Sequence, residues 1–104
     1  MSELSNKQFS FSLMLGKLLI YIYEQGYTAT FGDVYALTGH KKNSNHGLRL
    51  AADLNLFLEG KWLNKGAPME KAHSLIHDYW DSLGGAKRIS NDLNHYSVEY
   101  QGRW

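Results

Sequence analysis

The fold of this chain is decided by residues 44–58, which read SNHGLRLAADLNLFL. From Leu48 onward, apolar side chains occupy every second position, and the positions between them are mostly polar or small. An alternation of period two over this length predicts a β-strand at 48–58 with one side facing a core. Asp53 lies in the middle of the other side, although aspartate is a poor strand former. A carboxylate in that place favours a functional role.

The composition predicts one ordinary globular domain spanning residues 1–104. Of the 104 residues, 43% are hydrophobic and 20% are charged, and the formal net charge is +1. Because the net charge is so small, it does not favour nucleic acid or an anionic membrane as a partner. The chain has no cysteine, so disulfides and thiolate ligands are excluded, and any zinc must be held by histidine and carboxylate groups.

The N-terminal sequence predicts a protein made in the cytoplasm without a signal peptide. Residues 1–4 lack a basic segment, and no small-residue cleavage site follows the apolar run at 9–23. Serine, glycine and lysine interrupt that run, which is too short and too polar to span a bilayer. We expect no insertion into a membrane, and we expect a monomer.

Local patterns predict the other elements. Ser5 and Gln8 fit a capping box that begins a helix at 6–25, and Gly26 suits its end. The later elements are a strand at 27–37, a turn at 59–61 and a short strand or anchored loop at 62–63. They are followed by a helix at 68–83, ended by Gly84 and Gly85, and by a strand at 95–100 that begins with His95. This order predicts an α+β fold, with a small, mostly antiparallel sheet and two helices on one of its faces.

Three polar side chains form a candidate metal site, namely His46, Asp53 and His95. If the strands that carry Asp53 and His95 share a sheet face, these two side chains are neighbours. His46 lies about 23 Å from Asp53 along an extended chain, so the chain must bend between them, and Gly47 permits a bend. Two imidazoles and one carboxylate leave the fourth tetrahedral position of a zinc ion open, as in catalytic sites.

Asp92 stands three residues before His95. At that spacing in a turn the two side chains lie roughly 5–6 Å apart, which suits a base beside a metal rather than a ligand. Such a base takes the proton of a metal-bound water and delivers it to a leaving amine. Taken singly, His46 fits an ordinary surface loop, and Asp92 fits an ordinary turn.

A rival metal pair is formed by His73 and His77, which are four residues apart on the second predicted helix. The pair is similar to the zincin motif, but Ser74 stands where that motif needs a glutamate base. On a helical wheel both histidines lie beside the apolar stripe, so we expect them to face solvent.

Two parts of the sequence resemble the M15 zinc peptidases. Residues 44–57 are similar to the family motif Ser-x-His-x-x-x-x-Ala-x-Asp. Residues 79–85 and 92–96 are similar to Trp-x-x-Leu-Gly-Gly followed by Asp-x-x-His-Phe. The family comprises D-Ala-D-Ala peptidases and phage L-alanyl-D-glutamate endolysins, and it shares its fold with the Hedgehog signalling domain. The resemblance extends over about residues 31–100.

The resemblance implies a Hedgehog/DD-peptidase-like fold and a zinc metallopeptidase that hydrolyses the stem peptide of peptidoglycan. It implies either a D,D-carboxypeptidase or an L-Ala-D-Glu endopeptidase. The site residues that it implies are the zinc ligands His46, Asp53 and His95, the catalytic base Asp92 and the substrate-binding Ser44. A chain without a signal peptide is most similar to phage or prophage endolysins. These stay in the cytoplasm until a partner pore opens the membrane, and then act on the cell wall.

The chain departs from the family pattern at two informative positions. The family commonly has glycine three residues after the first histidine, where this chain has Arg49. Arg49 shares the side of the strand that carries Asp53, so it either binds a substrate carboxylate or oxyanion or pairs with Asp53. Many relatives carry an arginine near the end of the first strand, where this chain has Ala36. These departures motivate an alternative, a catalytically silent phage protein of the same fold that acts as a binding or structural module.

A small nucleic-acid binder is a third hypothesis. It is supported only by four basic residues near aromatic ones, namely Lys41, Lys42, Lys87 and Arg88. We therefore expect no nucleic acid among the partners.

Overall fold

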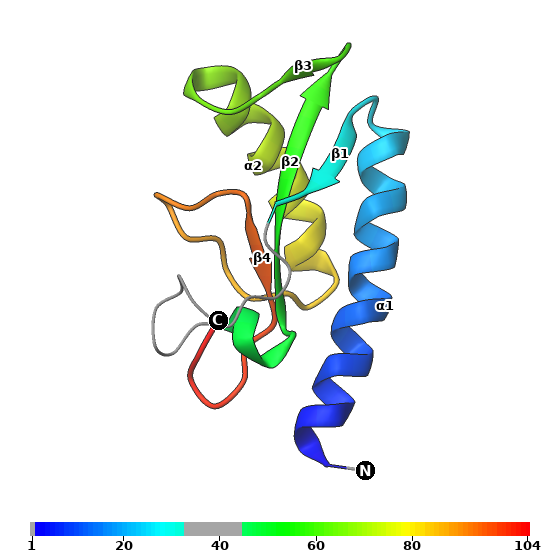
Figure 1. The fold of residues 1–104 in the computed structure, drawn as a ribbon, viewed down its shortest axis with the longest axis vertical. Helices are drawn as coiled ribbons and strands as arrows, with labels where there is room; N and C mark the ends of the chain where they lie inside the picture. The colour runs from blue at the N-terminus through cyan, green and yellow to red at the C-terminus, as the bar shows by residue number, and fades with distance from the viewer. Residues whose placement is uncertain (1, 33–44) are drawn as a thin grey trace.

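The fold is a small α+β domain with two helices and a four-stranded antiparallel sheet, as the sequence predicts (Figure 1). The computed structural model describes residues 2–32 and 45–104, with Asn45 and His46 described by their backbone alone. The elements are α1 (Glu3–Glu24), β1 (Thr28–Phe31), the 3-10 helix η1 (Asn45–Leu48), β2 (Ala51–Leu58), β3 (Lys61–Trp62), α2 (Gly66–Ser82) and β4 (His95–Ser97). The second half of the strand predicted at 27–37 lies outside the described residues.

Strand β2 is the centre of the sheet and pairs antiparallel with the three other strands. The Gly32 amide donates to the Asp53 carbonyl at 2.8 Å, whereas the Leu54 amide donates to the Asn94 carbonyl at 2.9 Å. The Asp53 carbonyl and the Leu54 amide belong to one peptide group, whose C=O and N–H point to opposite edges of the strand, so β1 lies along one edge of β2. β3 and the chain entering β4 lie along the other edge. The N-terminal half of β2 therefore has β4 as its neighbour, and the C-terminal half has β3.

A two-residue turn connects β2 to β3. Glu59 and Gly60 have φ of 52° and 79°, the left-handed conformations that a type I′ hairpin turn requires at both central positions. This turn fixes the register in which Phe57 faces Trp62 and Leu58 faces Lys61.

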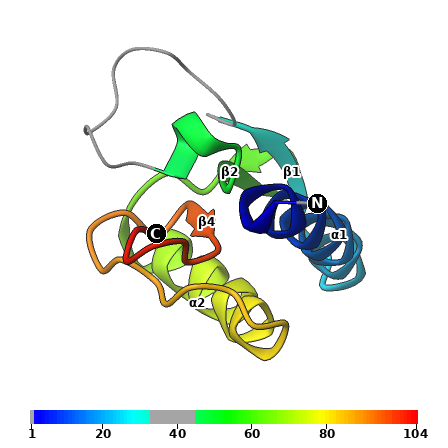
Figure 2. The ribbon, with the colours of Figure 1, turned by 90° about the horizontal axis from the view of Figure 1, so that it is seen from below.

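The helices cover one face of the sheet, and the core lies between the two layers (Figure 2). Three side chains of β2 on that face are fully buried, namely Ala52, Leu54 and Leu56, and so is Leu50 just before the strand. The two helices pack side by side through aromatic pairs. Phe11 meets the Trp80 ring edge-on at 5.9 Å, and Tyr21 stacks on Tyr79 at 4.0 Å. The alternation along β2 therefore predicts the core face correctly.

The start of α1 differs from the capping box predicted at Ser5 and Gln8. Ser2 is the N-cap, and its hydroxyl accepts a hydrogen bond from the Ser5 amide at 3.1 Å. The Gln8 side chain instead donates to the Leu48 carbonyl at 2.9 Å, and so joins α1 to η1. The prediction was wrong because the helix begins earlier, at Glu3, so the Ser5 amide that Gln8 would accept from in a capping box donates to Ser2 instead. No helix in the described part of the chain is long and apolar enough to cross a membrane.

Two consecutive glycines end α2. Gly84 has φ of 93°, a left-handed conformation that suits glycine after the last helical turn. A Cβ on Gly85 would collide with the Trp80 indole ring. Both glycines are therefore needed for the chain to turn closely around Trp80 and run toward β4.

Candidate metal centre

The register between β2 and β4 brings two of the predicted metal ligands together. Asp53 and His95 are directly paired across the two strands, and Asp53 Oδ1 lies 3.5 Å from His95 Nδ1. Both side chains are largely withdrawn from solvent, with 22% of the Asp53 side chain and 6% of the His95 side chain exposed. The parity argument from the sequence predicts that Asp53 and His95 share a face, and the structure confirms it.

The chain bends sharply before β2, although not where the sequence suggests. The strand predicted to begin at Leu48 begins at Ala51, and it is preceded by η1. The residue with left-handed backbone is Arg49, with φ of 57°, so the bend does not depend on the predicted Gly47. Glycine adopts this conformation without steric cost, whereas a residue with a Cβ such as Arg49 does so with some strain.

Two of the expected site residues are not described at side-chain level. Ser44 lies outside the described residues, and His46 is described only as backbone in η1. Arg49 is exposed at the end of η1. Whether it contacts a substrate or pairs with Asp53 remains a prediction with two alternatives.

Gly32 supports the Asp53 side of the sheet. A Cβ built on Gly32 would lie 3.3 Å from the Cβ of Asp53, and the Gly32 amide donates to the Asp53 carbonyl. The end of β1 therefore packs tightly against Asp53 and restricts the space beside its carboxylate.

Asp92 and His95 lie at the two ends of one tight turn. The His95 amide donates to the Asp92 carbonyl at 3.1 Å, and the Asp92 amide donates to the Ile89 carbonyl at 2.9 Å. The bond between Leu54 and Asn94 ties this turn to β2. The backbone thus holds Asp92 one turn away from His95, as the spacing of the two residues predicts.

Three ring side chains of α2 hold β4 and the turn that leads into it. The ring of His73 bonds through Nδ1 to the Tyr96 hydroxyl at 2.7 Å, and Trp80 donates from Nε1 to the Ser97 carbonyl at 2.8 Å. Between them, His77 donates from Nε2 to the Leu93 carbonyl at 2.7 Å and stacks on the Tyr96 ring at 4.1 Å. These contacts fix β4 from the core side.

The prediction that His73 and His77 face solvent was wrong, because both are buried, with 1% and 0% of their surface exposed. Burial lowers the pKa of each to about 4, with a further lowering at His73 from the neighbouring His77. Burial also raises the pKa of the Tyr96 hydroxyl. Sequence reasoning missed this cluster, and its only local signal was that the two histidines border the apolar stripe.

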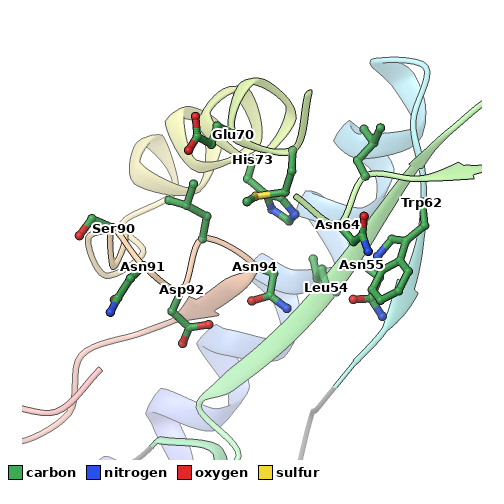
Figure 3. A pocket seen from close by; sticks show the side chains of 13 residues that line it. Leu54, Asn55, Trp62, Asn64, Glu70, His73, Ser90, Asn91, Asp92 and Asn94 are labelled. Carbon is green, nitrogen blue, oxygen red and sulfur yellow. The ribbon is translucent and has the colours of Figure 1, made fainter. Parts of the chain in front are cut away.

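A cavity of about 410 Å³ lies between β2, β3, α2 and the Asp92 turn, and neither Asp53 nor His95 is among the residues that line it (Figure 3). Leu54 and Asn94, the chain neighbours of Asp53 and His95, form part of its wall, and so does Asp92. Its other lining residues are Asn55, Trp62, Leu63, Asn64, Met69, Glu70, His73, Ser90, Asn91 and Leu93. In Figure 3, His73 and Asn94 lie near its middle, with Trp62 toward one end and Ser90 toward the other.

Asp53 and His95 meet the geometric requirement for two zinc ligands. Donors about 2.0–2.1 Å from a tetrahedral zinc lie about 3.3–3.4 Å from each other, and the distance between Asp53 Oδ1 and His95 Nδ1 is 3.5 Å. The described residues contain no group of three or more possible ligands. The expected third ligand, His46, is not among the side chains described.

The basic residues considered for nucleic-acid binding have other contacts. Arg88 forms ion pairs with Asp78 at 2.7 Å and Asp81 at 2.9 Å. The hydrogen bond that Arg88 donates to Asp78, followed by the one that it donates to Asp81, raises the pKa of Arg88. The Lys87 ammonium lies 5.4 Å from the centre of the Trp104 ring. Lys41 and Lys42 lie outside the described residues.

Comparisons of the chain with family models, with curated proteins and with solved structures found no match.

Proposed function

We propose that this protein is a zinc-dependent peptidase that hydrolyses the stem peptide of peptidoglycan. The observation that carries the proposal is the pairing of Asp53 with His95, whose donor atoms are 3.5 Å apart. A carboxylate and an imidazole held at that separation suit two adjacent corners of a tetrahedral zinc site.

The expected zinc ligands are His46, Asp53 and His95, and the bound ion would supply Lewis-acid polarisation of a peptide carbonyl. The bend formed by η1 supports the third ligand, because it replaces the extended chain that would carry His46 far from the ion. The rival pair, His73 and His77, is a weaker candidate because one nitrogen of each ring already bonds within the core.

Asp92 is the proposed general base. It lines the cavity and lies one turn from His95, which supports a base near the proposed ligands rather than a ligand itself. A carboxylate in that position accepts the proton of the attacking water and returns it to the leaving amine, a role that typically contributes about 10²–10⁴-fold to the rate.

The choice of substrate rests on the resemblance of residues 44–57 and 79–96 to the M15 motifs. That resemblance supports a D-Ala-D-Ala or L-Ala-D-Glu bond of the stem peptide, on a cell wall that the protein reaches after release.

The test combines elemental analysis with digestion of purified sacculi. We expect about one zinc per chain in the wild type and little in His95→Ala. We expect Asp92→Asn to keep its zinc and to lose at least about 100-fold in hydrolysis. Asp81 is an exposed acid on α2, so Asp81→Asn is the matched control. It should keep both the bound zinc and the hydrolytic activity. A wild type that takes up no zinc on titration would overturn the proposal.

A different result would favour the alternative function. Zinc binding and sacculus binding without any turnover, in the wild type as well as in Asp92→Asn, would identify a silent binding module.

A further inference from the structure

We infer that the cavity beside Asp92 is a subsite for an uncharged peptide segment, in which the His73 Nε2–H group donates a hydrogen bond to a substrate carbonyl. If the proposed function holds, on which this inference rests, the protein cuts within a peptide rather than beside a free C-terminal carboxylate. His73 belongs to none of the expected site residues, and it acts from α2, on the core side of the sheet.

His73 is a buried polar side chain in the wall of an open cavity. Only 1% of its surface is exposed, yet it lines the 410 Å³ cavity together with Asn94 and Asn64 (Figure 3). Its Nδ1 atom bonds to Tyr96, while Nε2 makes no hydrogen bond with the described residues. Nε2 is not among the fully buried polar atoms that lack a partner, so a ligand in the cavity can reach it.

The bond to Tyr96 selects the tautomer of His73. The Tyr96 hydroxyl is fully buried, and its hydrogen bond among the described residues is the 2.7 Å contact with His73 Nδ1. If Nδ1 carried the proton, the hydroxyl hydrogen would have no acceptor, which costs about 1–3 kcal/mol for a buried donor. The hydroxyl therefore donates to Nδ1, and Nε2 carries the ring proton.

The ring is also neutral near pH 7, because burial lowers its pKa to about 4. His73 therefore presents a neutral N–H donor to the cavity, which suits a carbonyl oxygen and does not compensate a full negative charge.

The rest of the lining is matched to peptide groups and unsuited to a carboxylate. Four asparagines, Asn55, Asn64, Asn91 and Asn94, line the cavity, and a carboxamide both donates and accepts hydrogen bonds as a peptide group does. Glu70 and Asp92 are acidic, and the described lining contains no lysine or arginine. Within this described lining, a free C-terminus would thus meet two acidic side chains and no basic one. The volume falls within the usual range of about 300–1,000 Å³ for ligand sites.

Two substitutions separate the two nitrogens of His73. The amide oxygen of asparagine replaces Nδ1, so His73→Asn keeps an acceptor for Tyr96 and loses the cavity donor. The longer glutamine places its NH₂ group where Nε2 stands, so His73→Gln keeps the cavity donor and loses the Tyr96 contact.

The probes are N-acetyl-D-alanyl-D-alanine and its C-terminal amide, titrated into the protein and followed by NMR shifts of the histidine ring protons. We expect the amide to bind at least about 5-fold more tightly than the free acid, which corresponds to about one hydrogen bond or charge contact. We expect His73→Asn to weaken amide binding about 5- to 10-fold while its melting temperature stays near that of the wild type. His73→Gln should bind the amide nearly as the wild type does and melt at a lower temperature.

Tighter binding of the free acid, or weaker amide binding in His73→Gln than in His73→Asn, would overturn the inference. Because binding is read without turnover, this outcome is distinct from failure of the peptidase proposal, which the zinc content and sacculus digests decide.

Discussion

The two buried histidines of α2 should make the stability of this protein depend on pH between 7 and 5. His73 and His77 have a pKa of about 4 in the folded protein against 6.5 in an unfolded chain. Between these values the unfolded chain binds more protons than the folded one, so the free energy of unfolding falls as the pH falls. Below about pH 4 the folded protein also takes up the protons, and the loss levels off.

The size of the effect follows from the two pKa values. Each histidine removes about 2 kcal/mol of stability between pH 7 and pH 5, and the two together remove about 4 kcal/mol. That is a large share of the about 5–15 kcal/mol typical of a domain. Carboxyl groups with an ordinary pKa of about 3.9–4.3 remain mostly ionised at pH 5, so they contribute little in this window.

The assay is urea unfolding at pH 7, 6 and 5, followed by tryptophan fluorescence, in which the buried Trp80 is the tryptophan that unfolding newly exposes to water. His77→Phe keeps a ring to stack on Tyr96 and removes one titrating group. It should be less stable at pH 7, because the Leu93 carbonyl loses its donor, yet show only about half of the predicted pH-dependent loss. Equal unfolding free energies at pH 7 and pH 5 in the wild type would refute the reasoning. So would ring-proton NMR that finds His73 or His77 titrating near 6.5 in the folded protein.

Three further substitutions test individual structural features by urea unfolding. At the left-handed Arg49, Arg49→Gly should be about 1 kcal/mol more stable than Arg49→Ala, and equal stabilities would contradict the assigned backbone conformation. Gly85→Ala should lower the free energy of unfolding by more than about 2 kcal/mol, because its methyl group collides with the Trp80 indole. Gly16→Ala, whose added Cβ has open space around it, should instead raise the free energy of unfolding by about 1 kcal/mol, because alanine favours the helix. Trp80→Phe should lower the free energy of unfolding by about 1–3 kcal/mol, because the Ser97 carbonyl loses its hydrogen-bond donor. An unchanged urea midpoint would exclude that hydrogen bond.

Much of the architecture follows from local sequence. The alternation through β2 predicts which side of the strand is buried, because successive strand side chains point to opposite faces. The spacing of apolar residues predicts both helices, and Gly84 and Gly85 predict where the second one ends. The same local patterns predict that Asp53 and His95 share a polar face and that Asp92 lies one turn from His95.

Other features depend on partners that are remote in the chain. Gln8 fits a local capping box, but it bonds to Leu48, which lies 40 residues away. From the sequence, Gly47 is the residue that permits a bend before the strand. In the structure the left-handed backbone is at Arg49, which lies between the end of η1 and the start of β2. Local propensity cannot rank such alternatives, since each depends on a contact that exists only after folding.

The sequence by itself determined the order and approximate extent of the helices and strands, the core face of β2 and the identity of the polar residues opposite that core. Only the tertiary structure decided the register that pairs Asp53 with His95, the burial of His73 and His77, and the cavity beside Asp92. The periodicity of a strand specifies the face on which a side chain lies, whereas its partner across the sheet depends on how two distant segments pair. Likewise, a helical wheel gives the direction of His73 and His77, but their burial depends on Tyr96 and the chain of β4 packing over them.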